Sequence, residues 1–359
     1  MGEVNPPPYN RREMHPILRH HPLDVRLRHV FRIARGASDV RHNLIVEAEA
    51  EGRTGIGEAA PILRYGEDRA SAARAVDEMA ARLGDARAFG VAARRAAVAG
   101  QSSAEAAVDM ALHDLAGQRL QAPLYEILGL DPSDTPQTSF TIGMDTPDVV
   151  VAKVREAAEY PVLKVKMGSD DDRAVLEAVR DTTDRPLRVD ANEGWTPAGA
   201  LERLEWLARL GVEFVEQPLP AGMIAETREL RRQSPLPLYA DESVHRAADI
   251  PALAGAFDGI NIKLMKCGGI AEALRMIAVA RAHGMKIMLG CMIESSIAIT
   301  AAAHLSPLVD TADLDGNLLL ESDPYVGAKV VAGRIVLPEG PGLGVEIDMD
   351  FVARYRIDP

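Results

Sequence analysis

The sequence has little cysteine, few aromatic residues and no long apolar run. Only two of the 359 residues are cysteines, Cys267 and Cys291, and both fall in or beside segments that we predict to be barrel strands. We therefore expect two small buried side chains, and neither a disulfide nor a cysteine metal site. No apolar stretch reaches the roughly 18 residues that a membrane-spanning helix needs. Residues 1–21 also lack the apolar centre of a signal peptide.

Negative charge outnumbers positive charge. The chain has 40 Lys and Arg residues against 53 Asp and Glu residues, a formal net charge of −13. This charge disfavours nucleic acid and anionic membranes as partners. The composition, 47% hydrophobic and 26% charged, is that of a globular protein. We therefore expect a cytoplasmic protein with no nucleic-acid or membrane partner. We also expect a homo-oligomer.

Changes in pattern divide the chain into four segments. Residues 1–16 are polar and proline-rich without periodicity, which predicts a disordered tail. Residues 17–132 are predicted to form an α+β domain, and residues 133–320 a β/α barrel. Residues 321–359 lose the helical pattern and become extended and rich in turns. We expect this last segment to return to the first domain rather than to the barrel.

Strands precede helices in the first domain, as is typical of an α+β fold. Two strands are predicted over 22–34 and 42–52, with a turn near Gly36. Residues 54–68 are punctuated by glycines and are predicted to form a loop. Alanine-rich helices with apolar residues at helical spacing follow over 69–128, and Ser102 or Ser103 is the expected N-cap of the second long helix.

Five ionisable residues recur through the barrel segment, each after a short apolar run: Lys166, Asp190, Glu216, Asp241 and Lys266. Each interval is about the length of a strand, a helix and two turns. A single such residue is most simply a helix cap or a solvated loop charge, but loop charges have no reason to keep a common period. The pattern predicts a modified TIM barrel, capped by the α+β domain, with strands at 138–144, 162–167, 187–192, 213–217, 238–242, 259–264, 286–292 and 311–315.

The acidic members of this series predict a metal site. The C-terminal ends of parallel barrel strands meet on one face, where catalytic residues gather. Asp190, Glu216 and Asp241 would converge there as hard oxygen ligands with no nearby His or Cys. Such a set favours Mg²⁺, with Mn²⁺ as the alternative. A cation also explains how three carboxylates tolerate one another.

The lysines predict two bases on opposite sides of that metal. Lys164 and Lys166 share a strand face, and mutual repulsion together with the cation is expected to lower the pKa of both. Lys266 would approach from the other side. Two such bases can remove a proton from a carbon beside a carboxylate and return one to the opposite face, which inverts that centre. The simpler alternative for Lys164 and Lys263 is an ordinary salt bridge.

The motifs K-x-K, D-A-N, V-E-Q-P, A-D-E-S and N-I-K-L-M-K-x-G-G, in this order and spacing, resemble the enolase superfamily and its muconate lactonizing enzyme subgroup. The resemblance extends from about residue 22 to 352 and includes GEAAPILRYGE, AAVDMALHDLAG and PGLGV. It implies that the three acidic residues bind Mg²⁺, that Lys166 and Lys266 are the acid/base pair and that Lys164 stabilises the substrate carboxylate. The supporting groups that it implies around them are Asn192 and Glu242, and we expect Lys263 to support the site as well.

The last barrel strand ends in Asp313-Leu314-Asp315, which resembles the dipeptide epimerases, where such a pair holds the free α-ammonium of the substrate. The two carboxylates share a strand face and would repel a dicarboxylate, although a turn-forming Asp before Gly316 is the simpler alternative. Arginines in the capping loops offer guanidinium forks suited to an acidic side chain. The expected substrate contacts are Asp313, Asp315, Ile293, Glu294, Arg32, Arg35, Arg64 and Tyr65.

These features predict a Mg²⁺-dependent dipeptide epimerase that inverts the α-carbon of the C-terminal residue through an enediolate. L-Ala-D/L-Glu from murein peptide metabolism is the first choice of substrate, and a hydrophobic or cationic dipeptide is left open. N-acylamino acid racemisation and o-succinylbenzoate synthesis are the alternatives on the same fold. A muconate-type cycloisomerase ranks lower. A non-catalytic enolase-like binding protein is the alternative of another class, although the chain keeps every lysine and metal ligand.

Overall fold

A computed structural model describes residues 15–33, 36–84, 86–168 and 171–350. The predicted tail therefore falls almost entirely outside the described residues, and so does Arg35. Within the described part, no helix is both long and apolar enough to cross a membrane.

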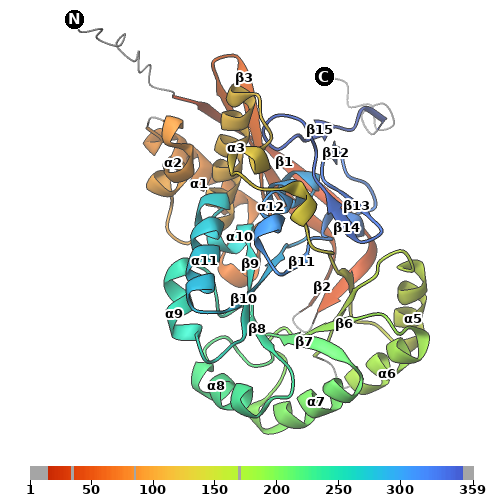
Figure 1. The fold of residues 1–359 in the computed structure, drawn as a ribbon. Helices are drawn as coiled ribbons and strands as arrows, with labels where there is room; N and C mark the ends of the chain where they lie inside the picture. The colour runs from red at the N-terminus through yellow and green to blue at the C-terminus, as the bar shows by residue number, and fades with distance from the viewer. Residues whose placement is uncertain (1–14, 34–35, 85, 169–170, 351–359) are drawn as a thin grey trace, which may run out of the picture.

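The centre of the molecule is a sheet of eight parallel strands in the order β11-β10-β9-β8-β7-β6-β5-β4 (Figure 1). A bridge between Thr138 and Ala312 brings the chain just before β4 beside β11, so the sheet closes on itself. The predicted barrel is confirmed, with each strand inside or within one residue of its expected segment. The strands are β4 (Phe140–Ile142), β5 (Leu163–Lys166), β6 (Leu187–Asp190), β7 (Val212–Glu216), β8 (Leu238–Ala240), β9 (Gly259–Lys263), β10 (Lys286–Gly290) and β11 (Thr311–Asp313).

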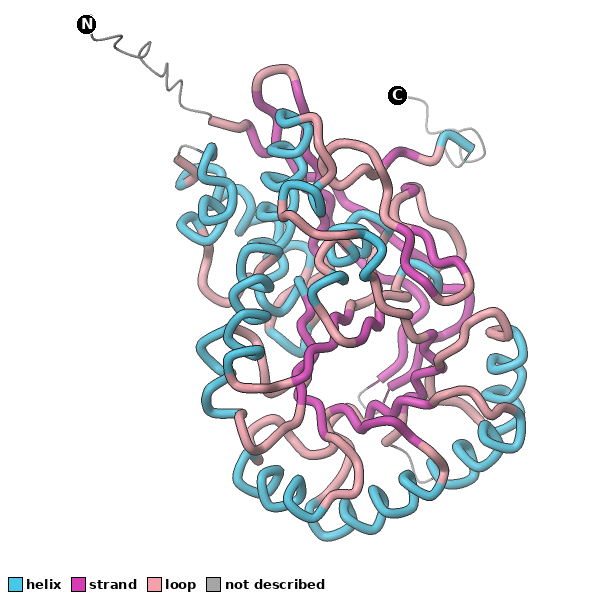
Figure 2. Tube along the Cα trace, viewed as in Figure 1, coloured by secondary structure: helices cyan, strands magenta, loops and turns pink. Residues whose placement is uncertain are grey.

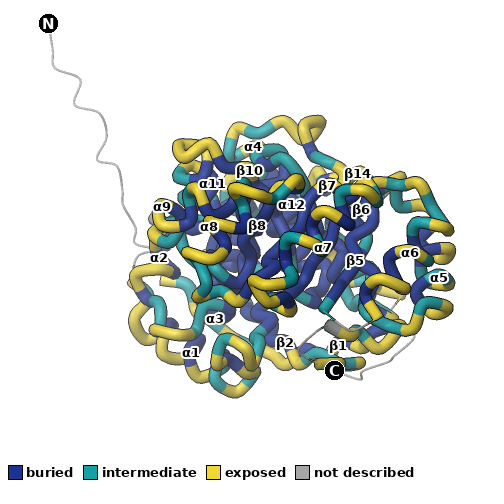
Figure 3. The backbone as a smooth tube through the Cα atoms, turned by 90° about the horizontal axis from the view of Figure 1, so that it is seen from below, coloured by how far each residue is buried: buried dark blue, intermediate teal, exposed yellow. Residues whose placement is uncertain are grey.

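Helices surround these strands (Figure 2). The strands are buried and the outward faces of the helices are exposed (Figure 3), as the amphipathic pattern of such helices requires. After β11 the described chain forms only a 3-10 turn, Asn317–Leu319, before it leaves the barrel, so the last βα unit lacks its helix. The surrounding helices are α5 (Pro147–Glu156), α6 (Asp172–Thr182), α7 (Pro197–Arg209), α8 (Ile224–Gln233), α9 (Ile250–Leu253), α10 (Leu264–Cys267), α11 (Ile270–Ala282) and α12 (Ser296–Ala303).

The N-terminal part forms an antiparallel sheet, β1-β2-β3, covered by helices. Strand β1 begins at Ile17, earlier than predicted, because Ile17 to His21 continue the pairing with β2. The elements are β1 (Ile17–Ile33), β2 (Gly36–Ala50), β3 (Arg53–Ala59), α1 (Arg69–Arg82), α2 (Phe89–Ala96), α3 (Ser102–Leu120) and α4 (Leu124–Ile127).

The loop predicted for 54–68 is wrong in its first half, which is strand β3. Its glycines are needed for close packing rather than for a turn. A Cβ on Gly55 would lie 2.1 Å from the carbonyl oxygen of Ala111, and one on Gly57 would lie 2.0 Å from that of Ala107. Helix α3 therefore rests directly on the backbone of β3, and only glycine leaves room for this contact.

The start of α3 also differs from the prediction. Its N-cap is Gln101, which makes no side-chain capping bond. The free amides of Ser102 and Ser103 instead donate to the two carboxylate oxygens of Glu67, at 2.9 and 3.0 Å. A carboxylate is favoured at a helix N-terminus by the helix dipole. Glu67, which is distant in sequence, therefore caps this helix in place of a local residue.

The C-terminal segment contacts both parts of the molecule. The amide of Leu343 donates to Asp114 in α3 at 2.7 Å, and the carbonyl of Gly342 accepts from Leu124 at 2.8 Å. The amide of Ala328, in contrast, donates to Thr300 in α12. The domain boundary at residue 320 therefore stays a prediction. The strands here are β12 (Tyr325–Val326), β13 (Lys329–Val331), β14 (Arg334–Val336) and β15 (Glu346–Ile347).

Candidate active site

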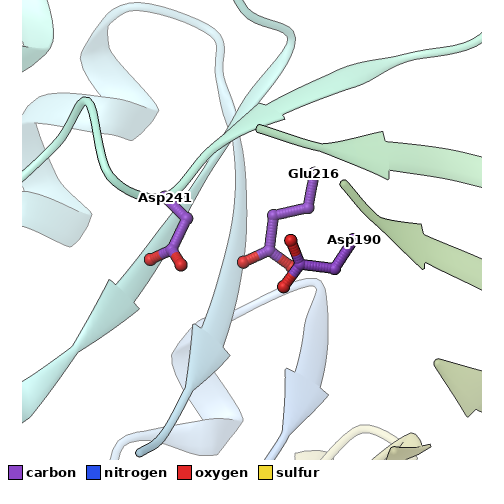
Figure 4. A group of neighbouring side chains, drawn as sticks. All are labelled: Asp190, Glu216 and Asp241. Atoms are coloured by element: carbon purple, nitrogen blue, oxygen red, sulfur yellow. The ribbon is translucent and has the colours of Figure 1, made fainter. Parts of the chain in front are cut away.

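Three buried carboxylates meet at the C-terminal end of the barrel. Asp190 ends β6, Glu216 ends β7, and Asp241 directly follows β8. Each offers an oxygen within 4.8 Å of the other two, and the side chains project from neighbouring strands toward a common space (Figure 4). The spacing of the sequence motifs thus brings these residues together as predicted.

The triad suits a hard divalent cation. Its donors are all carboxylate oxygens, the ligands that Mg²⁺ and Mn²⁺ prefer. Burial and the neighbouring charge of Asp190 raise the pKa of Glu216 to about 7. A negative charge on Glu216 is therefore unfavourable when only protein groups are present. A bound cation would offset that charge. The residues present therefore fit a magnesium site.

Lys164 and Lys166 extend from β5 into this carboxylate cluster. Lys164 Nζ lies 2.6 Å from Glu216 Oε2 and 2.6 Å from Asp313 Oδ2, and Lys166 Nζ lies 2.6 Å from Asp190 Oδ2. Burial lowers the pKa of Lys164, but the surrounding carboxylates outweigh burial and raise it well above its usual value. The expected lowering of its pKa is therefore wrong for the protein groups alone, because three carboxylates lie within 3.3 Å of its ammonium.

The structure places Lys263 and Lys266 differently from the prediction. Lys263, predicted as a supporting group, ends β9, lies 2.9 Å from Asp241 Oδ2 and lines a cavity that opens at the barrel mouth. Lys266, predicted as a base, lies in the one-turn helix α10 and is absent from the cavity wall. Its ammonium donates to backbone carbonyls, including that of Val244 at 3.1 Å. The strand ends before Lys266, and its ammonium lies behind the triad, where it also pairs with the carboxylate of Asp241.

A cavity of about 850 Å³ opens above the triad, between the barrel mouth and the capping sheet. A drug-sized ligand fits a space of this volume. The barrel contributes charged and polar groups to its wall, and the cap contributes loops. Its wall includes Lys166, Asn192, Asp241, Glu242, Lys263, Ile293, Asp313 and Asp315 from the barrel and Arg41, Arg64 and Tyr65 from the cap.

Asp313 and Asp315 both reach the cavity, as the sequence predicted. Asp313 accepts hydrogen bonds from Lys164 and from the hydroxyl of Ser139, and Asp315 accepts one from the amide of Thr141 at 2.5 Å. Burial and the charge of Asp313 raise the pKa of Asp315 to about 7. A cationic ligand group near this pair would favour the charged form of Asp315.

Glu294 does not line the cavity with Ile293. Its carboxylate accepts from the amide of Met292 at 2.7 Å and is buried. Burial and the nearby Glu58 raise its pKa to about 8. The structure therefore gives this carboxylate a local backbone contact in place of the predicted substrate contact.

The cap presents several arginines, but most have carboxylate partners. Arg64 pairs with Glu193, and Arg32 pairs with Asp145. Arg41 also lines the cavity, and no carboxylate of the described residues forms an ion pair with it. Burial lowers its pKa, and its Nε has no hydrogen-bond acceptor. The sequence reasoning missed Arg41 because it considered only the segments 32–38 and 62–67, whereas Arg41 lies just beyond the first of them, in strand β2.

Asn192 and Asn261 support the triad. The amide of Asn192 donates to Asp190 Oδ1 at 2.9 Å, and its side chain lies 3.5 Å from Glu242. Asn261 donates to Glu216 Oε1 at 2.7 Å. The sequence reasoning missed Asn261, although it belongs to the motif that contains Lys263. The spacing could have indicated it, because an asparagine two residues before a strand-end lysine shares the strand face of that lysine.

A closed β/α barrel with a carboxylate triad between lysine-bearing strands defines a class of enzymes, and the sequence matches that class. The chain belongs to the enolase superfamily: residues 20–129 match the mandelate racemase / muconate lactonizing enzyme N-terminal domain, and residues 149–351 match the enolase C-terminal domain-like family.

Three relatives are particularly similar. The L-Ala-D/L-Glu epimerase of Bacteroides thetaiotaomicron is 45% identical over 90% of this chain and 86% of its own length. The L-Ala-D/L-amino acid epimerase of Pedosphaera parvula is 41% identical over 89% of this chain and 95% of its own length. Among solved structures, the dipeptide epimerase of Enterococcus faecalis complexed with Mg and L-Leu-L-Tyr superposes with a TM-score of 0.87, at 34% identity, over 93% of this chain and 100% of that one.

Proposed function

We propose that the protein is a Mg²⁺-dependent dipeptide epimerase that inverts the α-carbon of the C-terminal residue. The observation that carries this proposal is a cavity lined by Asp241 of the acidic triad, by Lys166 and Lys263 from strands that flank the triad, and by the Asp313–Asp315 pair. The first two features suit proton transfer beside a carboxylate. The third distinguishes a free amine from an acylated one. The relatives named above support the proposal, since two are L-Ala-D/L-Glu and L-Ala-D/L-amino acid epimerases and the third is a dipeptide epimerase complexed with Mg and a dipeptide.

In this proposal Lys166 and Lys263 face opposite sides of the substrate α-carbon. They end β5 and β9, which lie on either side of the three acidic strands. The neutral amine of one removes the α-proton, and the ammonium of the other returns a proton to the opposite face. Lys164 is proposed to stabilise the charge of the substrate carboxylate from below the cavity, because it is buried outside the cavity wall and pairs with Asp313 and Glu216. The cation held by Asp190, Glu216 and Asp241 would stabilise the charge that develops on that carboxylate and offset the carboxylates that raise the pKa of Lys263.

Proton exchange in deuterated water tests the proposal directly. With Mg²⁺ present, L-Ala-L-Glu and L-Ala-D-Glu should each gain one mass unit at the α-carbon of Glu and interconvert, as followed by NMR and mass spectrometry. A panel of hydrophobic and cationic dipeptides, run in the same way, ranks the substrates. Absence of exchange in every dipeptide contradicts the proposal, and preference for an N-acyl amino acid favours N-acylamino acid racemisation.

Asp313 and Asp315 are proposed to bind the substrate α-ammonium. An ammonium buried without a partner costs several kcal/mol, so Asp313→Asn or Asp315→Asn should lower kcat/KM for dipeptides at least about tenfold. N-acetylation of the substrate should cause a comparable loss in the wild type and little further loss in the variants. The measurement is a two-by-two comparison of enzyme and substrate. If the losses from substitution and from N-acetylation are additive, these residues do not bind the amine.

The choice of L-Ala-D/L-Glu rests on Arg41, the cavity arginine without a carboxylate partner among the described residues. A guanidinium pairs well with a carboxylate side chain. Arg41→Met should therefore lower kcat/KM for L-Ala-L-Glu at least about tenfold, a loss of about 1.4 kcal/mol, and change that for L-Ala-L-Met much less. Arg69→Met is the control, because Arg69 lines the same cavity but already pairs with Asp24. Equal losses for both dipeptides would contradict this role.

We further propose a cytoplasmic enzyme of murein peptide metabolism that works as a homo-oligomer, with residues 17–132 acting as the cap over the barrel. The anionic surface expected from the net charge of −13 supports neither nucleic acid nor membrane as a partner. Size-exclusion chromatography with light scattering measures the oligomeric state.

A further inference from the structure

The ammonium group of Lys266 is enclosed by the protein. The residue is 2% exposed. Its Nζ donates to Oδ1 and to the carbonyl oxygen of Asp241, and to the carbonyl oxygens of Val244 and Asn261 at 3.1 and 3.3 Å. An ammonium has three N–H groups, so these four acceptors use all of its donors. Such a group has no contact with a ligand in the cavity.

These acceptors connect Lys266 to two of the three carboxylates in the triad. One contact is direct, because Asp241 Oδ1 accepts from the ammonium. The other passes through Asn261, whose carbonyl accepts from Lys266 and whose side chain donates to Glu216 Oε1 at 2.7 Å. With Oδ1 of Asp241 held from behind, Oδ2 is the oxygen that faces Lys263, at 2.9 Å.

The backbone that carries Lys266 is itself fixed from the capping side. Helix α10 is followed by Gly268 and Gly269, at φ values of +85° and +110° that favour glycine. A Cβ on Gly269 would lie 2.5 Å from Asp109 Oδ2 in α3. The same carboxylate accepts from the amide of Ala271 at 3.1 Å. The turn is therefore pressed against α3 and has little freedom to move.

We propose that Lys266 is a positioning residue: its ammonium sets the orientation of Asp241 and, through Asn261, of Glu216, for cation binding. The inference rests on the proposed function for its catalytic consequence, but its structural basis is independent of the substrate. A buried cation costs several kcal/mol unless it is paired and hydrogen-bonded. The contacts of Lys266 meet that condition and leave no donor for a reacting atom.

Lys266→Met tests the proposal, because it keeps much of the side-chain length and removes the donors. Groups that orient metal ligands typically change metal affinity about 10–100-fold when lost, so Mn²⁺ affinity, measured by electron paramagnetic resonance of the free ion, should fall by about that factor. The rate of deuterium exchange should fall by the same factor for both substrate epimers. Lys153→Met is the matched control, because Lys153 is a half-buried lysine that pairs with Asp145 outside the triad.

Lys266→Gln provides a second variant if Lys266→Met does not fold, since its amide still donates two hydrogen bonds without charge. Wild-type Mn²⁺ affinity in either folded variant overturns the proposal. So does a loss of exchange confined to one epimer, which would make Lys266 a base. If the wild type exchanges no dipeptide at all, the proposed function fails, whereas the Mn²⁺ comparison still decides the role of Lys266.

Discussion

Lys263→Ala is expected to abolish epimerisation and to preserve α-proton exchange in only one of the two substrate epimers. Removal of a general base costs about 10²–10⁴-fold in rate. The epimer whose α-hydrogen faces Lys166 should still lose that hydrogen to solvent, and Lys166→Ala should show the opposite selectivity. NMR of each pure epimer in deuterated buffer measures the two rates separately.

Two outcomes would contradict this assignment. Equal exchange of both epimers in both variants would mean that a single group serves both faces. Unchanged epimerisation in Lys263→Ala, combined with one-sided exchange in Lys266→Met, would restore the assignment made from the sequence. The Lys153→Met variant controls for the loss of a lysine as such, because its ion pair with Asp145 lies outside the triad.

Asp190→Asn is expected to remove activity and divalent-cation binding together. Asp190 is fully buried, and its oxygen is one of three that lie within 4.8 Å of one another. Loss of a charged ligand removes several kcal/mol of charge stabilisation from the transition state, so kcat/KM should fall at least about 1,000-fold, or roughly 4 kcal/mol. Glu216→Gln and Asp241→Asn should behave alike, and chelation of the wild type should reproduce the loss reversibly.

The control for these variants is Asp114→Asn, another buried aspartate that contacts backbone amides of β3 and the C-terminal segment and lies away from the triad. It should keep its Mg²⁺ dependence. Circular dichroism on each protein separates unfolding from loss of the site. Full turnover by any triad variant after chelation would refute the metal site.

The barrel and the triad could be predicted because both depend on a long-range period. A one-residue error at a strand end does not move Asp190 or Glu216 from the barrel mouth, since each ends its strand. The choice between Lys263 and Lys266 could not be made in this way. Both lysines follow the same apolar run, and the point where β9 gives way to α10 decides which side chain enters the cavity. Strand ends are the part of a sequence-based assignment that is least certain.

Two other errors came from contacts that local sequence does not encode. The glycines at 55 and 57 resemble those of a loop, but they are required by the carbonyl groups of α3, a helix about fifty residues later. Arg41 could not be singled out from the sequence, because it is distinguished only by having no ion-pair partner among the described residues. Such features depend on tertiary packing, which overrides local preference.

The capping of α3 by Glu67 has a consequence for how substrate preference can change. Glu67 is fixed to the amides of Ser102 and Ser103, and the next residue, Asp68, caps α1. The segment that carries Arg64 and Tyr65 into the cavity is therefore anchored directly after these residues, at the N-termini of α3 and α1. A wall held in this manner presents its side chains in a preformed arrangement, which lowers the entropy lost on binding. Exchange of the residues at positions 63–65 would then alter which peptides are accepted while the backbone around them stays the same.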